Sequence, residues 1–361
     1  MSFATLKITV FGESHGPAVG VTVEGFPAGI PIDEQSLQAF MARRKTQNAA
    51  FTTPRVEEDR PLFLSGVKNG YTTGAPLNAT IYNADKRSGD YEAFRDVPRP
   101  SHADYVAGVK YKGFADLAGG GHFSGRLTAP LCVVGYLAET YLEKSGIFVG
   151  AYLSEAGGIS AVSYLDGIPA KEEIEATQGK PVPVLRGVKQ KEIEERLQSV
   201  RAEGDSVGGV IECVALGLPV GLGECGFRSM EGRIASAIFS VPATKGVEFG
   251  SGFLLTKMKG SEGNDPWTLS GGAVVPKTNH NGGINGGITN GAPLLVRVAV
   301  KPTPSIAKEQ DSVNLKDMTP TKLTVGGRHD ACIALRAVPV VEACVAIAIA
   351  DALLEMQGQN F

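Results

Sequence analysis

The sequence has little net charge and no long uninterrupted apolar run. Lysine and arginine number 35 and aspartate and glutamate 38, so the formal net charge is −3. A chain this close to neutral has no global field that recruits nucleic acid or an anionic membrane, so any anionic ligand needs a local basic cluster. The longest apolar candidate, residues 338–354, is interrupted by Glu342 and Asp351. It falls short of the roughly 18 apolar residues of a membrane span, and we expect an amphipathic helix there.

Cysteine is also scarce, and its spacing excludes the common metal sites. The five cysteines are scattered along the chain: Cys132, Cys213, Cys225, Cys332 and Cys344. No CxxC or Cys/His spacing typical of zinc is present. The apolar stretch among the first residues is too short and too polar for a signal peptide. We therefore expect buried, reduced thiols, no metal site and a cytoplasmic location.

No linker, charge run or low-complexity tract divides the chain. Strand-like and helix-like segments alternate irregularly along the 361 residues. Neighbouring strand candidates at 6–11 and 19–24, and at 61–66 and 77–83, suggest antiparallel pairs, which argues against a strictly alternating parallel fold. The pattern predicts a single α/β domain of the α+β kind over residues 1–361. Further strands are expected at 147–154, 207–216 and within 291–305, and helices at 34–44, 104–112, 126–144, 189–203, 229–241 and 331–357.

Glycine is abundant rather than scarce. There are 46 glycines, where a typical protein of this length has about 25. They gather in five clusters at 118–125, 156–159, 269–274, 281–291 and 325–330. Glycine permits left-handed backbone and close approach of a ligand. Several such loops suggest one site assembled from distant parts of the chain.

The five histidines all lie in predicted loops rich in glycine, proline or acidic residues: His15, His102, His122, His280 and His329. In the first of these loops, "FGESHG", Ser14 and His15 are neighbours, so their side chains would point to opposite faces of a strand. A serine nucleophile with a histidine base is therefore disfavoured. A histidine that donates a proton or a hydrogen bond to an anion fits better, with Ser14 as a further donor.

Four further loops combine basic residues with hydroxyl groups, and each has a plain structural alternative. Asp104 in "RPSHAD" either orients His102 or caps the next helix. "GGGHFSGR" either binds an anion at a helix start or is a tight packing turn. "KPTPS" (301–305) either holds a phosphate or is a solvated loop. Asp330 in "GGRHDA" would cap a helix without any function. Together the basic residues form either a solvated rim or a pocket for a polyanion.

The order of the motifs resembles one known family, the chorismate synthases, from about residue 6 to residue 355. The motifs are "FGESHG", "GYTTGAP", "RPSHADY", "GGGHFSGR", "EGDSVGG", "KGVEFGSGF", "NHNGGINGGITNG", "KPTPSI" and "RHDACIALRAVPVVEA". The resemblance implies a β-α-β sandwich and usually a homotetramer. It implies the anti 1,4-elimination of phosphate from 5-enolpyruvylshikimate 3-phosphate to give chorismate, the last common step of the shikimate pathway. It also implies reduced FMN (FMNH2) as cofactor, without net redox change.

The resemblance implies roles for individual residues. His15, His102 and Asp330 match the catalytic positions: His15 near the substrate phosphate and the flavin, His102 as proton donor to the reduced flavin, and Asp330 in taking the C6 proton through the flavin. The matches for substrate binding are Ser14, Arg44, Arg99, Arg126 and Arg328. Those for FMN binding are Arg44, His122, Phe123, Ser124, Pro242, Ala243, Gly286, Lys301, Pro302, Thr303, Pro304, Ser305 and Arg328. NADPH is a candidate reductant, but no dinucleotide motif is visible, and we expect an external reductant.

The chain departs from the family pattern in three places. His122 and Phe123 stand where many members have arginine and serine, Ser101 stands where they have glycine, and a basic residue is lost near Ala50. Two other readings stay open at this stage. One is a different flavin- or phosphate-dependent lyase on the same scaffold, and the other is a non-catalytic anion- or nucleotide-binding protein.

Overall fold

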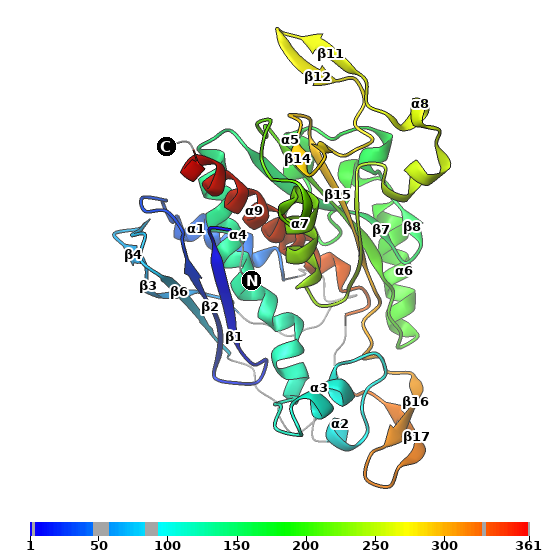
Figure 1. Ribbon diagram of the computed structural model, residues 1–361. Helices are drawn as coiled ribbons and strands as arrows, with labels where there is room; N and C mark the ends of the chain where they lie inside the picture. The colour runs from blue at the N-terminus through cyan, green and yellow to red at the C-terminus, as the bar shows by residue number, and fades with distance from the viewer. Residues whose placement is uncertain (2–3, 46–57, 84–92, 327–329, 360–361) are drawn as a thin grey trace.

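Two antiparallel sheets enclose a layer of helices in the computed structural model (Figure 1). The structure describes residues 1, 4–45, 58–83, 93–326 and 330–359. The first sheet has the strand order β1-β2-β6-β3, with β1 at Lys7–Gly12, β2 at Ala18–Glu24, β6 at Leu77–Tyr82 and β3 at Leu62–Ser65. In β1 and β2 apolar and polar residues alternate, and Ile8, Val19, Val21 and Val23 are buried. The register opposes Val10 to Val21, which turns the apolar face of this sheet toward the helices.

The second sheet is longer and more apolar. Its order is β10-β15-β9-β7-β8, with β10 at Thr244–Phe249, β15 at Leu294–Val300, β9 at Gly209–Leu216, β7 at Phe148–Ala156 and β8 at Ile159–Ser160. The central strands β9 and β15 are buried on both faces. One face meets the helix layer, and the other is covered by a second small core that includes Tyr152, Tyr164 and Leu185. This explains why β9 and β15 read as continuous apolar runs rather than as alternating ones.

The helix layer consists of α1 (Glu34–Ala42), α4 (Thr128–Glu143), α7 (Met230–Phe239) and α9 (Ala334–Gln359). In Figure 1, α4 and α9 lie between the two sheets. A Cβ added to Gly135 of α4 would lie 2.2 Å from Cβ of Ala343 in α9, so these two helices approach closely only because position 135 carries no side chain. The packing of α4 matters for the site, because the predicted anion-binding loop opens directly into this helix.

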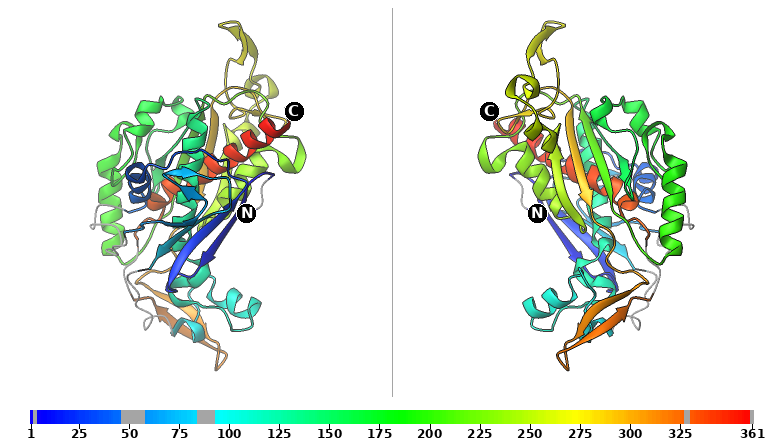
Figure 2. Two further views of the ribbon diagram at one scale, coloured as in Figure 1. Left: turned by 90° about the vertical axis from the view of Figure 1, so that its left-hand side faces the viewer. Right: turned by 90° about the vertical axis from the view of Figure 1, so that its right-hand side faces the viewer.

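The remaining elements lie around the two sheets and the helix layer, which together form a sandwich. Figure 2 shows from both sides that two hairpins extend beyond it, one at each end. The two-stranded pieces are β4 (Val67–Lys68) with β5 (Tyr71–Thr72), β11 (Trp267–Ser270) with β12 (Ala273–Pro276), β13 (Ile284–Asn285) with β14 (Ile288–Thr289), and β16 (Glu309–Asn314) with β17 (Thr319–Thr324). The further helices are α2 (Ala93–Asp96), α3 (Asp104–Lys110), α5 (Lys171–Glu175), α6 (Gln190–Ala202) and α8 (Gly260–Gly263).

Most predicted elements are confirmed within a few residues, including the two antiparallel strand pairs. The interpretation of residues 338–354 as an amphipathic helix is wrong. Glu342 and Asp351 are fully buried in α9 because each is paired with an arginine, so the helix is enclosed on almost all sides. Its length and composition would also suit a membrane span, but 94% of its most apolar window is buried inside the protein, as in a core helix.

Asp351 fixes the position of β1, and with it the loop that carries His15. Its carboxylate accepts hydrogen bonds from the backbone N–H groups of residues 4, 5 and 6 at 2.8 to 3.2 Å. Arg233 of α7 donates to the same carboxylate at 2.5 Å and balances its charge. A buried charge is stable only with such partners. The central helix therefore holds the start of the first sheet in place.

A second carboxyl group in the helix layer, that of the half-buried Glu139 of α4, lacks this compensation. Its Oε1 atom is buried and accepts no hydrogen bond among the described residues. The neighbouring Glu342 is already engaged by Arg43. Burial first, and then the charge of Glu342, raise the pKa of Glu139 well above its ordinary value. The folded protein therefore keeps this group protonated to a higher pH than the unfolded chain does.

We predict that Glu139→Gln stabilises the protein at neutral and alkaline pH. In the unfolded chain Glu139 releases its proton near pH 4.5, whereas the folded protein retains it. The parent therefore loses stability as the pH rises above that value, by up to about 1.4 kcal/mol per pH unit until the folded pKa is reached. Urea unfolding of parent and variant between pH 4 and 9 measures the difference, which should vanish below about pH 4.5. The matched control is Glu143→Gln, one turn later and exposed; an equal effect there would contradict the prediction.

Candidate functional site

Three consecutive glycines form the centre of the candidate site. Gly119, Gly120 and Gly121 have φ angles of 60°, 90° and 51° within the turn Ala118–Phe123. A Cβ at Gly119 would lie 2.0 Å from the His15 ring, and a Cβ at Gly120 would lie 3.3 Å from Cε1 and Nε2 of His102. The left-handed backbone and the lack of space both require glycine here. The loop therefore lies between two predicted catalytic histidines that are 87 positions apart in the chain.

The "FGESHG" segment is a turn at the end of β1, held by its neighbours on several sides. The Ser14 N–H donates to the Gly121 carbonyl at 3.1 Å, and the Ser14 side chain is buried. Nδ1 of His122 lies 3.1 Å from the Gly12 carbonyl. The Asn83 amide donates to the carbonyls of residues 13 and 16 at 3.1 and 2.9 Å. These bonds fix the backbone beside His15 so that its ring faces the glycine loop.

His102 belongs to a compact group with Arg99 and Asp104. His102 Nδ1 lies 2.7 Å from Asp104 Oδ1, and Arg99 donates to both carboxylate oxygens of Asp104 at 2.7 and 2.8 Å. Burial raises the pKa of Asp104, but the hydrogen bonds from Arg99 and His102 outweigh it and leave the pKa below its usual range. The ionised carboxylate thus engages one ring nitrogen, and Nε2 stays on the side of the glycine loop.

The same group explains two features of the sequence. Asp104 orients His102 and also begins α3 (Asp104–Lys110), although its side chain makes no capping bond within that helix. Of the two alternatives for Asp104, the structure therefore supports orientation of the histidine. Ser101, which stands where the resembled family has glycine, has a φ of 56°. This left-handed conformation favours glycine.

Arg44 and Arg126 meet at one carboxylate, that of Asp59. Arg44 Nη1 donates to Asp59 Oδ2 at 2.8 Å, and Arg126 Nη1 donates to Asp59 Oδ1. The side chains of the three residues are only 4 to 7% exposed. Arg126 Nε also donates to Asn83 Oδ1 at 2.9 Å, which links it to the turn around His15. The two arginines are among the residues predicted from the sequence, whereas Asp59 is not, because a single aspartate in an acidic stretch carries no motif.

Asp330 is buried and lies next to this arginine pair. Arg336 Nη1 donates to Asp330 Oδ2 at 2.9 Å, and Arg336 Nε donates to the Arg44 carbonyl at 3.0 Å. Helix α9 begins only at Ala334, so the alternative reading of Asp330 as a helix N-cap is wrong. Arg328 and His329 lie outside the described residues, as does Ala50.

The segment 301–305 reaches the Arg99–His102 group from the second sheet. Lys301 Nζ donates to the Ser101 carbonyl at 2.8 Å, and Arg99 Nη1 lies 3.5 Å from Ser305 Oγ. Burial and the nearby Lys245 lower the pKa of Lys301. Thr303 Oγ1 is buried with no hydrogen-bond partner among the described residues. Pro302 and Pro304 flank Thr303 in the sequence.

Five of the other predicted cofactor residues lie beside segment 301–305 or within the glycine loop and the turn that follows it. Ala243, with a φ of 71°, accepts a hydrogen bond from the Lys301 N–H at 2.9 Å, so Pro242 and Ala243 lie beside segment 301–305. Ser124 Oγ accepts the Arg126 N–H, which caps the turn before α4. The Phe123 ring centroid lies 6.3 Å from that of Tyr111, and His122 is exposed.

Gly286 is not brought to the histidines by any described contact. It lies in the turn between β13 and β14, which packs against the start of α7 through the hydrogen bond from Met230 to Gly287. Figure 1 shows β14 and α3 at opposite ends of the molecule.

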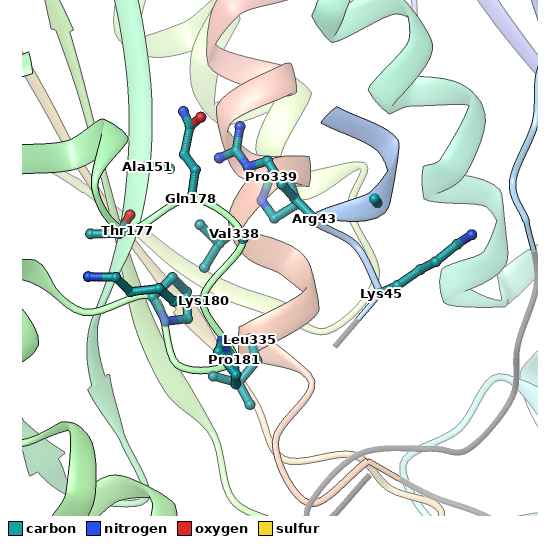
Figure 3. A pocket seen from close by; sticks show the side chains of 13 residues that line it. Arg43, Lys45, Ala151, Thr177, Gln178, Lys180, Pro181, Leu335, Val338 and Pro339 are labelled. Carbon is teal, nitrogen blue, oxygen red and sulfur yellow. The ribbon is translucent and has the colours of Figure 1, made fainter. Parts of the chain in front are cut away.

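Two hollows lie near these residues, and they differ in size. A cavity of about 20 Å³ lies between Arg43, Ala151 and Pro339 (Figure 3). It has room for about one water molecule, and Arg43 is already paired with Glu342. A larger hollow of about 480 Å³ adjoins the glycine loop at Leu117 and Ala118 and reaches Asp104. Only the larger one has the volume of a small-molecule site.

The arrangement can bind anions and transfer protons. Two imidazoles and several guanidinium groups converge on one backbone loop, and the carboxylates among them are themselves paired with arginines. In such a partly buried setting charge-assisted hydrogen bonds are strong. Among the described residues, no group of three or more histidine, cysteine, aspartate or glutamate side chains could hold a metal ion.

Comparison with known proteins gives a consistent result. The family model for chorismate synthase matches residues 6–354. A chorismate synthase from Chitinophaga pinensis is 48% identical over 360 residues, which cover 99% of this chain and 98% of that protein. One from Korarchaeum cryptofilum is 46% identical over 354 residues, covering 98% and 97%.

A crystal structure of a chorismate synthase has the same fold, with a TM-score of 0.77 and 31% sequence identity. The match covers 99% of this chain and 94% of that one. Family, full-length relatives and fold agree with the resemblance seen in the motifs. The chain belongs to the chorismate synthase family, whose members are carbon–oxygen lyases of the shikimate pathway.

Proposed function

We propose that this protein converts 5-enolpyruvylshikimate 3-phosphate into chorismate and phosphate at the loop 119–121. The observation that carries the proposal is the insertion of this loop between His15 and His102. A multiply charged substrate bound there would lie within reach of two proton donors and of the arginines that adjoin them. The bonds that break are C3–O to phosphate and C6–H. The C6–H electron pair forms a new ring double bond, the existing ring double bond shifts toward C3, and the C3–O electron pair departs with the phosphate.

The substrate carries a phosphate and two carboxylates, and the site offers cations to match them. We assign Arg44, Arg99 and Arg126 to substrate binding, with Ser14 as a hydroxyl donor and Arg328 as an expected fourth arginine outside the described residues. Guanidinium groups suit this task because they bind planar oxyanions with two parallel hydrogen bonds. Burial strengthens these bonds, since little water competes with them.

Three residues are assigned to proton transfer. His15 would donate a hydrogen bond or proton to the departing phosphate. Since Asp104 engages Nδ1 of His102, Nε2 is the atom from which His102 would transfer a proton. Asp330, held by Arg336, would accept the proton that leaves C6.

The residues around 301–305 fit the phosphate-bearing cofactor FMN. Lys301 supplies an ammonium group, and Thr303 supplies a buried hydroxyl that has no partner among the described residues. Pro242, Ala243, Ser124, His122 and Phe123 would line the same cofactor, and Gly286 is the expected contact that lies farthest away. Bound in its reduced form, FMN would lend electron density to the substrate while phosphate departs and recover it afterwards.

We further propose a single domain spanning the chain, a homotetramer and a cytoplasmic location. The shared helix layer supports the first. Large exposed apolar side chains, such as Phe114, Phe227 and Trp267, support association between subunits. Four of the five cysteines are buried as free thiols and Cys225 is exposed, which suits a reducing compartment.

We predict that His15→Ala and His102→Ala each reduce turnover roughly 10- to 10⁴-fold, as is usual when an acid–base group is lost. Circular dichroism should show an unchanged fold. The matched control is His280→Ala, because His280 bonds to Ser251 Oγ instead of facing the glycine loop. Parent-like turnover in both His15 and His102 variants would refute the assignment.

We also predict that chorismate forms anaerobically with dithionite-reduced FMN and hardly at all with oxidised FMN plus NADPH. The reason is that the sequence shows no dinucleotide-binding motif for NADPH. Chorismate and phosphate should appear in equal amounts. Equal rates under both conditions would show that the protein reduces its own flavin, and no product under either would contradict the proposed reaction.

A further inference from the structure

Asp59 is a buried carboxylate between two of the proposed substrate-binding arginines. Each of its oxygens accepts a hydrogen bond from a different guanidinium group, Oδ2 from Arg44 and Oδ1 from Arg126. Arg44 follows helix α1, and Arg126 precedes helix α4. Asp59 therefore connects the end of helix α1 to the start of helix α4 and lies between two positive charges.

Other nitrogens of the two guanidinium groups donate to neutral acceptors. Arg44 Nη2 donates to Thr128 Oγ1 at 3.0 Å and approaches the Gly125 carbonyl at 3.4 Å. Arg126 Nε donates to Asn83 Oδ1. Among the ion pairs of the described residues, the two cations share the one carboxylate of Asp59. Asp59 is thus a counter-charge that the two guanidinium groups share.

Two buried guanidinium groups repel each other unless an anion lies between them. Burial lowers the pKa of Arg44, and the charges of Arg336 and Arg126 lower it further, while Asp59 acts in the opposite direction. Burial raises the pKa of Asp59, but Arg44 and Arg126 outweigh it, so the group stays ionised. Removing this charge would leave the cations uncompensated in a region of low dielectric constant.

The backbone of Asp59 supports a specific role. Its φ is 50°, a left-handed conformation that costs energy for a residue other than glycine. Residues held in this region persist where the surroundings fix them, and they occur often at functional sites. Here the two arginines hold the side chain, and Arg126 is in turn linked to the turn around His15 through Asn83.

We propose that Asp59 is a positioning residue that fixes Arg44 and Arg126 as one receiving pair for an anionic group of the substrate. The inference rests on the proposed function, since it assumes that both arginines bind substrate. Asp59 touches neither substrate nor cofactor in this account. It sets the separation and orientation of the two guanidinium groups, and it keeps Arg126 in line with the turn that carries His15.

The test uses steady-state kinetics of the full-length enzyme with reduced FMN and 5-enolpyruvylshikimate 3-phosphate. Asp59→Asn should raise KM roughly 10- to 100-fold, the range expected when a buried charge loses its partner. It should leave kcat within about threefold, because the proton-transfer groups stay in place. Asp59→Glu, which keeps the charge, should have a KM between that of the parent and that of Asp59→Asn. A merely structural role would lower the melting temperature and leave KM unchanged.

The matched control is Glu342→Gln. Glu342 is likewise a buried carboxylate paired with an arginine, the adjacent Arg43, but it does not contact Arg44 or Arg126. This variant should lose stability without a change in KM. If either variant fails to fold, Asp59→Glu still tests the proposal, because the longer side chain displaces the pair and should shift KM rather than kcat.

Arg126→Gln separates this inference from the assignment on which it rests. If Arg126→Gln leaves KM unchanged, the assignment of Arg126 to substrate binding is wrong. If Arg126→Gln raises KM but Asp59→Asn does not, only the inference about Asp59 fails. If both hold, the double variant should raise KM by less than the product of the two single effects, because Asp59 acts partly through Arg126. Additive effects on KM would overturn the positioning role.

Discussion

The whole site depends on the contact between the glycine backbone at 119–120 and the imidazole rings of His15 and His102. Gly119 and Gly120 lie against His15 and His102, and even one methyl group at Gly119 would overlap the His15 ring. Three further features hold the two sides of this contact in place. Asp351 anchors β1, the turn after β1 presents His15, and α4 fixes the far end of the loop. The tight packing of α4 on α9 keeps that helix from shifting.

Charge compensation is the second constraint. The carboxylates of the site are paired with arginines: Asp104 with Arg99, Asp330 with Arg336, and Asp59 with both Arg44 and Arg126. These pairs make burial of the ions tolerable. Among the described residues of the site, Lys301 and four arginines outnumber the three carboxylates, which favours a polyanionic ligand although the net charge of the chain is near zero. A small local excess of positive charge, rather than the net charge of the whole chain, thus attracts an anionic ligand.

Much of this could be predicted from the sequence, and the limits have physical causes. Apolar periodicity located most strands and helices, and the glycine and histidine motifs identified the loops that converge. Asp59 was missed because its role depends on two arginines 15 and 67 positions away along the chain. The enclosure of α9 was misjudged because Glu342 and Asp351 look like a polar face until their arginine partners are known. The separation of Gly286 from the histidines likewise depends on tertiary packing alone.

The turnover of a Gly119→Ala variant tests the central claim most directly. Gly146 offers a matched comparison, because its φ of 73° resembles the 60° of Gly119 but a Cβ there meets nothing within 4 Å. Both substitutions impose similar backbone strain, of order 1 kcal/mol, and only the one at position 119 displaces His15. The account predicts that Gly119→Ala loses at least tenfold in turnover, roughly the effect of a lost acid–base group, while Gly146→Ala stays near the parent at a similar melting temperature. Parent-like turnover in Gly119→Ala would contradict it.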